Sequence, residues 1–396
     1  MSRNSGIIIF LFVLFFGVSC DTVPENGQST NETAGVSENQ ILIGSSLALG
    51  GHAGYLGTRM LEGARAYIRH VNDSGGIHRR KIKVIARDDR YDPATCLLNT
   101  QQLIIDDGVF ALFCYVGTPT TVKIIPLVTE AAVPVVGMFT GAARLRKPVN
   151  RYLINIRASY YQETRAAVDF LVQRKELSRV AVFYQYDEYG FDGLRGTELA
   201  LKEHGLKPVA KGSYIRGTKN VKKGLDKIIA SRAQAVVMIG TYDVCARFIQ
   251  RAEQKGFSPL FYNVSFVGSE ELARLLGNTD QKVLVTQVVP PPAPHVNRNP
   301  SPGGVEQYTR LMQRYYPDSR PNVAGLEGYI NARVIVEGLK RAGRDLTRTK
   351  FINAIESIKE LDLGISNRIS FGRRDHQGLD RVYFTRIENG ELVLVK

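Results

Sequence analysis

One stretch near the start of the chain constrains the fold more than any other. Residues 41–49 form an apolar run typical of a buried strand, and residues 50–54 are rich in glycine, which favours a tight turn. Apolar residues then recur at helical spacing until Gly75 and Gly76 end the pattern, and residues 81–86 have the composition of a second strand. This order of strand, turn, helix and strand predicts a right-handed βαβ crossover, the unit from which parallel sheets are built.

The rest of the chain repeats the alternation of strand and helix. Residues 235–239 are continuously apolar, which is typical of a strand buried on both faces of a parallel sheet. Amphipathic stretches such as 194–204 and 246–255 separate the predicted strands. We therefore expect an α/β protein with parallel sheets covered by helices on both faces. The roughly 355 residues beyond the N-terminal segments are too many for one ordinary core, so two domains are expected.

The first 20 residues predict export. Arg3 precedes an apolar run at residues 7–16, which is too short to cross a bilayer because spanning helices need about 20 residues. Small residues then lead to Cys20, an arrangement that resembles the bacterial lipobox, in which this cysteine is lipidated. Residues 1–20 are therefore expected to be a lipoprotein signal peptide. Ordinary cleavage near Ser19, which leaves Cys20 free, is the alternative.

Polarity and charge indicate how the chain meets the membrane. Residues 21–38 are rich in small polar residues and nearly free of large apolar ones, which predicts a flexible tether. The chain carries a net charge of +14. Nucleic-acid binding is not expected, because an exported chain meets no nucleic acid and the basic residues lack interleaved aromatic ones. A basic surface facing anionic lipid headgroups is the preferred interpretation.

Three further cysteines bear on the redox state. Cys96 lies in the first turn of a predicted helix, and Cys114 lies near the end of a predicted strand. Helices begin at the edge where parallel strands end, so both cysteines are expected at one edge, and a disulfide between them is predicted for an exported protein. Two buried free thiols are the alternative. Cys245 has no evident partner and is expected to be a packed thiol.

Short motifs follow one another along the chain in a fixed order and spacing. They contain Ile43 and Gly44, Gly75 to Ile77, Arg80 to Ile82, Asp88 and Asp89, Asp92 and Pro93, Gly117 to Thr120, Phe139 to Ala142, Tyr189 and Gly190, and Gly328 and Tyr329. Together they make the chain from residue 39 to residue 396 similar to the type I periplasmic binding proteins of branched-chain amino acid ABC transporters. The resemblance implies two Rossmann-like lobes with parallel central sheets, joined by three crossover segments and closing over a ligand.

The resemblance also implies the boundaries of the lobes. The N-terminal lobe is expected to comprise residues 39–156 and 288–366, and the C-terminal lobe residues 157–287 and 367–396. The three crossover segments are expected near residues 155–158, 285–289 and 364–370.

The N-terminal lobe is expected to hold a carboxylate, because small molecules bind at the carboxyl ends of strands in open α/β sheets. Thr118 suits a helix N-cap, with the N–H and hydroxyl groups of the residues after it favouring an anion. Plain capping without a ligand is the alternative. The resemblance adds the loop after the next strand to this site. The expected ligand-binding residues are Thr118, Thr120, Thr121, Phe139, Thr140 and Gly141, with Tyr55 as an aromatic candidate that could equally be plain surface.

The C-terminal lobe is expected to close over the ligand. The resemblance places Tyr189, Tyr242 and Ser265 in the cleft. A buried ammonium group needs an acidic or carbonyl partner, and the family supplies a glutamate in the loop after the strand that follows Tyr242. This sequence departs from that pattern, since its loop has no acid until Glu270. Either Asp243 substitutes, or the ligand lacks an amine.

The sequence favours binding over catalysis. It contains no Gly-x-Ser-x-Gly or His-Glu-x-x-His motif, and its six histidines are dispersed, so neither an enzyme, a metal site nor a cofactor is expected. We expect a lipid-anchored periplasmic protein that delivers an amino acid or related carboxylate to an ABC permease. The alternatives are the sensing component of a signalling system, a binder of aromatic or aliphatic acids without an amine, and an exported α/β hydrolase.

Overall fold

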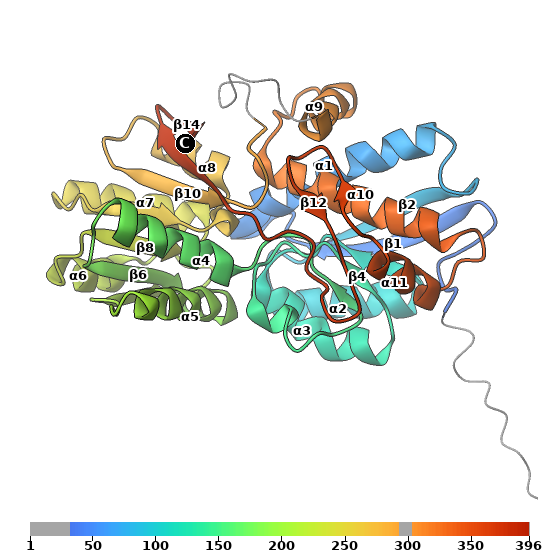
Figure 1. Ribbon diagram of the computed structural model, residues 1–396, viewed down its shortest axis with the longest axis horizontal. Coiled ribbons are helices and arrows are strands. Elements are labelled where there is room, and N and C mark those ends of the chain that lie inside the picture. Colours follow the sequence, from blue (N-terminus) through green and yellow to red (C-terminus); the bar gives the residue numbers. More distant parts are fainter. Residues whose placement is uncertain (1–31, 293–302, 396) are drawn as a thin grey trace, which may run out of the picture.

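The computed structural model describes residues 32–292 and 303–395, which form two α/β lobes side by side (Figure 1). The N-terminal lobe has a parallel five-stranded sheet of order β2-β1-β3-β4-β5. Its strands are β1 (Gln40–Leu47), β2 (Lys81–Asp88), β3 (Ala111–Phe113), β4 (Val135–Val136) and β5 (Leu153–Ile154). The predicted signal peptide, Cys20 and residues 21–31 of the predicted tether lie outside the described residues.

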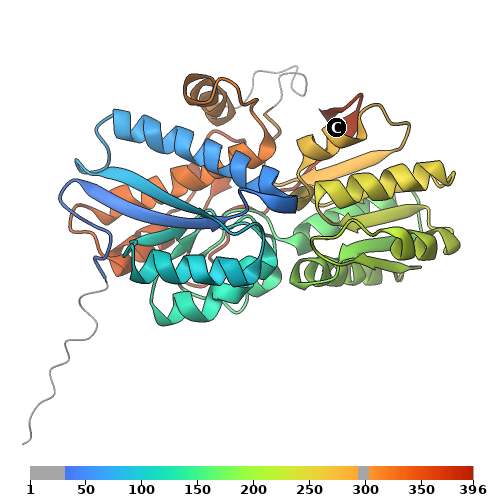
Figure 2. The same cartoon turned by 180° about the vertical axis from the view of Figure 1, so that it is seen from behind.

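Helices cover both faces of this first sheet (Figures 1 and 2). On one face α1 (Gly54–Asp73) packs lengthwise on α10 (Val323–Ala342), with α9 (Gly303–Tyr315) and α11 (Arg348–Glu356) beside them. The opposite face carries α2 (Pro93–Ile105) and α3 (Thr118–Glu130). The helices after residue 303 therefore pack on the N-terminal lobe.

The C-terminal lobe is built on a seven-stranded sheet of order β14-β13-β10-β9-β8-β6-β7. Its parallel strands are β6 (Val180–Gln185), β7 (Lys211–Tyr214), β8 (Ala235–Ile239), β9 (Leu260–Asn263) and β10 (Val283–Gln287). At one edge β13 (Tyr383–Glu388) and β14 (Glu391–Leu394) are antiparallel. The helices are α4 (Tyr160–Asp169), extended by a π-helical turn at Phe170–Arg174, α5 (Glu188–Glu203), α6 (Lys222–Ala230), α7 (Tyr242–Gln254) and α8 (Ser269–Leu276). The predicted fold class is confirmed.

The chain passes between the lobes after β5, after β10 and again before β13. The predicted boundary between residues 366 and 367 comes too early. There β12 (Arg368–Ile369) pairs with β11 (Leu361–Asp362), and His376 contacts the Leu153 carbonyl of the N-terminal lobe. The crossover follows Gln377, and the chain then joins the second sheet as β13. The apolar pattern predicted strands here, but it could not tell which lobe would supply their hydrogen bonds.

Residues 32–38 correct the predicted extent of the tether. The Glu32 carbonyl accepts the backbone N–H of Arg348, and the Glu32 carboxylate accepts the N–H of Thr349 in the first turn of α11. Val36 forms a β-bridge with Ile41. These residues therefore pack on the N-terminal lobe, because polar residues that satisfy free helix N–H groups are stabilised without a large apolar surface.

The predicted disulfide is also wrong in this structure, in which Cys96, Cys114 and Cys245 are free, buried thiols. Cys96 belongs to α2. The Cys114 sulfur accepts the side-chain N–H of Asn331 on α10, at 3.7 Å. The helices α2 and α10 cover opposite faces of the sheet (Figures 1 and 2), so Cys96 belongs to one face and the Cys114 sulfur contacts the helix on the other. Both residues lie near the same edge of the sheet, but side chains on opposite faces cannot be bridged.

Candidate functional site

The predicted ligand-binding residues all follow strands of the two sheets, at the carboxyl ends where the lobes meet. In the N-terminal lobe they come after β1, β3 and β4, and in the C-terminal lobe after β6, β8 and β9. The short 3₁₀ helices η2 (Ala143–Leu145) and η4 (Ser265–Val267) lie in these connections. The topology therefore brings residues from six separate loops to one interface.

Thr118 and Thr140 form the polar centre of the N-terminal lobe. Their buried hydroxyl oxygens are 2.7 Å apart, and Thr140 also accepts the backbone N–H of Ala142. Gly117, at a positive φ of 101°, is the N-cap of α3, so Thr118 is the first helical residue rather than the expected cap. Gly141 must be glycine, because a Cβ there would lie 2.6 Å from the Tyr160 nitrogen.

Thr120 and Thr121 are buried but are engaged within their own helix. The Thr120 hydroxyl donates to the Val116 carbonyl at 2.5 Å, and the Thr121 hydroxyl donates to the Gly117 carbonyl at 2.6 Å. A hydroxyl has one proton to donate, and a carboxylate can only accept. The structure thus favours capping over ligand contact for these two hydroxyls, which was the alternative reading of the motif.

An aromatic cluster fills the interface next to the threonine pair. Its centre is Phe266 of η4, whose ring centroid lies 4.6 Å from that of Tyr189, 5.6 Å from that of Phe139 and 5.8 Å from that of Tyr91. Tyr160 packs on Tyr189 at 5.2 Å. All five rings are buried. Phe139 and Tyr91 belong to one lobe and the other three to the second, so the cluster joins the lobes.

Phe139 and Tyr189 were predicted from the sequence to bind the ligand. The other three residues of the cluster, Phe266, Tyr91 and Tyr160, were not. Phe266 directly follows Ser265 in the loop after β9, and Tyr91 follows the acidic pair after β2. Both therefore stand at the strand ends where binding residues were expected. Tyr160 lies just beyond the first crossover segment. Its hydroxyl is buried with no hydrogen-bond partner among the described residues.

Tyr55 and Tyr242 meet across the interface, so Tyr55 is not plain surface. Their rings are T-shaped with centroids 6.0 Å apart, and the Tyr242 hydroxyl accepts the Tyr55 N–H at 3.4 Å. Burial raises the pKa of Tyr242 to about 12, which keeps this hydroxyl neutral. The pair is a second aromatic contact between the two lobes.

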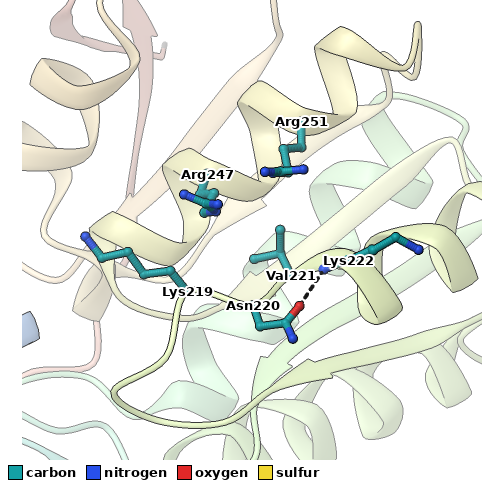
Figure 3. Close-up of a pocket in the computed structure, with 6 residues that line it drawn as sticks. All are labelled: Lys219, Asn220, Val221, Lys222, Arg247 and Arg251. Carbon is teal, nitrogen blue, oxygen red and sulfur yellow. Dashed lines mark hydrogen bonds between the residues drawn. The ribbon is translucent and has the colours of Figure 1, made fainter.

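Asp243 lies in the first turn of α7, next to Tyr242. Its carboxylate pairs with Lys219 at 2.8 Å. Lys219 borders a surface hollow of about 400 Å³ on the C-terminal lobe, lined also by Asn220, Val221, Lys222, Arg247 and Arg251 (Figure 3). This hollow lies beside α6 and α7, outside the interface between the lobes. Asp243 is therefore already paired with an exposed lysine, and its role as the partner of a ligand amine stays a prediction.

Ser265 belongs to a buried network of charges at the first crossover segment. Arg157 donates to the Ser265 hydroxyl, and Ser265 donates to Glu163 at 2.9 Å. Arg157 also lies 3.6 Å from Glu163 of α4 and 3.6 Å from Glu327 of α10, with its guanidinium 4.5 Å above the Phe139 ring. Arg157 thus links both lobes to the aromatic cluster, a role that the sequence did not predict.

The electrostatics of this network follow from burial. Glu163 accepts hydrogen bonds from the Ser265 N–H and the Thr286 hydroxyl, at 2.8 and 2.6 Å, in addition to the Ser265 hydroxyl. Glu327 has fewer donors, and burial raises its pKa to about 7 despite the nearby Arg157. One guanidinium is shared by two carboxylates, and Glu327 is the one that accepts fewer hydrogen bonds.

Two α/β lobes that meet at the carboxyl ends of their parallel strands, with buried polar groups and rings between them, have the architecture of a two-lobed solute-binding protein. The sequence profile of the periplasmic binding proteins matches residues 40–391. The chain belongs to this family, as a type I periplasmic binding protein of the branched-chain amino acid type.

Individual relatives agree with this assignment. The chain is similar to a solved structure described as a possible leucine/isoleucine/valine-binding protein from Rhodopirellula baltica, with a TM-score of 0.85, 32% identity and coverage of 90% of this chain and 96% of that one. It is 22% identical to Leu/Ile/Val-binding protein homolog 7 of Brucella abortus, over 90% of this chain and 91% of that protein. The match to an amino acid binding protein of Pseudomonas aeruginosa, 24% identical, spans 56% of this chain and 59% of that protein.

The described residues contain neither a metal site nor a membrane-spanning helix. No group of histidine, cysteine and acidic side chains within residues 32–292 and 303–395 is arranged to hold a metal ion. None of the helices in these ranges combines the length and apolar character that crossing a bilayer requires. Asp88 and Asp92 instead hold a turn and cap α2, since Asp88 accepts the Leu49 N–H and Asp92 the Thr95 N–H.

Proposed function

We propose that this protein captures a small carboxylate-bearing solute between its lobes and delivers it to an ABC permease. The observation that carries the proposal is the Thr118–Thr140 pair, buried beside rings from both lobes. Two hydroxyls joined by one hydrogen bond use one proton and leave the other free to donate. A carboxylate is a strong acceptor for such a donor, and the surrounding rings suit an apolar substituent.

The names of the relatives agree with this chemistry. Proteins named for leucine, isoleucine and valine binding share the fold and nearly the full length of the chain. Their ligands carry one carboxylate and an apolar side chain, so an amino acid is the first candidate. Contact between the lobes around such a ligand removes it from water, and a permease can then recognise the joined lobes.

Substitution of the threonines tests the site. Thr140→Val removes a hydroxyl of the pair at nearly constant volume, and a lost hydrogen bond to a charged group weakens binding by roughly 10- to 150-fold. Thr121→Val is the matched control, because its hydroxyl donates to the Gly117 carbonyl of its own helix. Calorimetry with leucine and with simple carboxylic acids measures both variants. Equal affinity losses in both would contradict the assignment, and so would binding of uncharged sugars in place of carboxylates.

We further propose that lipidation of Cys20 anchors the protein to the periplasmic side of a membrane. The support is the apolar run followed by small residues and cysteine. One acyl chain anchors a protein only marginally, so two or more chains are expected. Cys20→Ser should move the protein from the membrane fraction to the soluble fraction. Unchanged fractionation of this variant contradicts the proposal.

A further inference from the structure

The acidic side chains around the aromatic cluster are already used by the protein. Glu163 accepts hydrogen bonds from the Ser265 N–H, the Ser265 hydroxyl and the Thr286 hydroxyl. Asp187 accepts the N–H of Tyr189 and the side-chain amide of Gln185, and pairs with Arg216. These contacts occupy the lone pairs that a ligand cation would need.

The other nearby acids are also engaged, and Asp89 accepts the Tyr91 N–H and the Ser46 hydroxyl. Asp192 accepts the Ala143 N–H, and Asp243 pairs with Lys219 at the surface. Glu327 keeps one oxygen without a hydrogen-bond partner among the described residues. That carboxylate borders a narrow crevice among Met138, Ile156, Val289, Ile330, Asn331 and Leu379, where Arg157 is its neighbour. An ammonium group there would lie beside the guanidinium, which disfavours a second cation.

The cluster itself offers an apolar wall and hydroxyl donors. Phe266 contributes its ring to the interface from the loop after β9, against Phe139, Tyr189 and Tyr91. Besides the threonine pair, the Tyr160 hydroxyl is fully buried, lies near Thr140 and Gly141, and makes no hydrogen bond of good geometry within the described structure. A buried hydroxyl without a partner is destabilising, so a ligand that accepts from it gains affinity. A carboxylate is such an acceptor, and an ammonium group is not.

We propose that the site between the lobes selects apolar carboxylic acids that lack an α-ammonium group, and that Phe266 sets this selectivity. The inference rests on the proposed function and names its ligand class. Burying an ammonium group without an acceptor costs far more than burying a methylene group in its place. The Phe266 ring packs favourably on an apolar chain and supplies no acceptor for the cation. In this structure the rings fill the interface, so the lobes must separate for such a ligand to enter.

Pairs of compounds that differ only in the amine test the inference on the full chain. Leucine is compared with 4-methylpentanoate, and phenylalanine with 3-phenylpropanoate, by calorimetry on protein freed of bound solutes by unfolding and refolding. The amine-free member of each pair is expected to bind at least about tenfold more tightly. If the amino acids bind equally or better, the inference is wrong and the proposed function stands. If no compound in the panel binds, both are wrong.

Substitution of Phe266 assigns the selectivity to one residue. Phe266→Glu supplies the missing acceptor, so the preference should shift toward the amino acids by about tenfold or more. Phe191→Glu is the control, because Phe191 is 44% exposed on α5, and it should leave the preference unchanged. Phe266→Leu keeps the wall apolar and should retain the preference for amine-free acids even if Phe266→Glu does not fold. A preference that is the same in Phe266→Glu and the wild type would overturn the role of Phe266.

Discussion

The carboxylate of Glu270, in the first turn of α8, accepts the backbone N–H of Val323, the first residue of α10, at 2.7 Å. This bond crosses from the C-terminal lobe to the N-terminal lobe. Two further bonds also have their acceptor in the C-terminal lobe and their donor in the N-terminal lobe. Asp192 accepts the Ala143 N–H, and the Tyr242 hydroxyl accepts the Tyr55 N–H. In each case the second lobe supplies an acceptor to an N–H at a helix start, where backbone donors lack partners within the helix. The lobes are thus joined partly by capping each other's secondary structure.

Glu270→Ala should weaken the association of the lobes. Glu270 is half-buried, so the loss of this hydrogen bond to a charged group should cost near the lower end of about 1.5–3 kcal/mol of the free energy that joins the lobes. Ligand affinity should then fall by roughly tenfold. Calorimetry gives the affinity, and small-angle scattering gives the compactness of the liganded protein. Glu271→Ala is the control, because Glu271 pairs with Arg274 within its own helix. An equal loss in both variants would contradict a bond between the lobes.

Ligand affinity should rise as the solution becomes more acidic. Burial raises the pKa of Asp192 from 3.8 to about 6 where the lobes meet. A carboxyl whose pKa is higher with the lobes together binds a proton more tightly in that state, so acid favours the joined lobes and the effect is lost as the pH rises through 6. One such carboxyl group should raise the ligand affinity by about tenfold between pH 8 and pH 5. Asp192→Asn keeps an acceptor but cannot titrate, so its pH profile should be flatter, and an unchanged profile would exclude Asp192 as the source.

Arg157→Met should destabilise the whole protein. It leaves the Glu163 and Glu327 carboxylates buried without their shared cation, and removing one partner of a buried ion pair costs about 3–5 kcal/mol. Urea unfolding measures the loss. Arg165→Ala breaks the exposed pair with Glu203 and should cost less than about 1 kcal/mol. Similar losses in the two variants would show that the network at the crossover segment has no special role.

The cysteines of the two lobes should remain reduced. Mass mapping without reductant should find Cys96, Cys114 and Cys245 as free thiols, unreactive in the native protein because they are buried, and reactive in urea. Burial raises the pKa of the Cys114 thiol, which further slows its reaction. Reductant should leave the urea midpoint unchanged. A urea midpoint lowered by reductant, or a pair of peptides linked through Cys96 and Cys114, would show that the predicted disulfide forms after all.

The fold could be predicted because its signals are local. Continuous apolar runs such as residues 235–239 specify buried parallel strands, and amphipathic runs between them specify the helices that cover the sheet. The same logic placed Thr118 at a strand end where the lobes meet, because that prediction needs only a few neighbouring residues and a rule about parallel sheets. Thr140, Tyr189 and Tyr242 were placed by the resemblance to the family.

The contacts at the site depended on residues far apart in the sequence. Asp243 is a candidate partner for the ligand amine, and the sequence did not predict its pairing with Lys219. Cys96 and Cys114 lie near one edge of a sheet but on opposite faces of it. No local pattern marks Arg157 as the partner of Glu163, Ser265 and Glu327, which belong to both lobes. The sequence by itself determined which segments become strands and helices, through the spacing of apolar residues. Only the tertiary structure decided which polar groups meet, because their partners are set by how helices pack on the sheets and how the two lobes face each other.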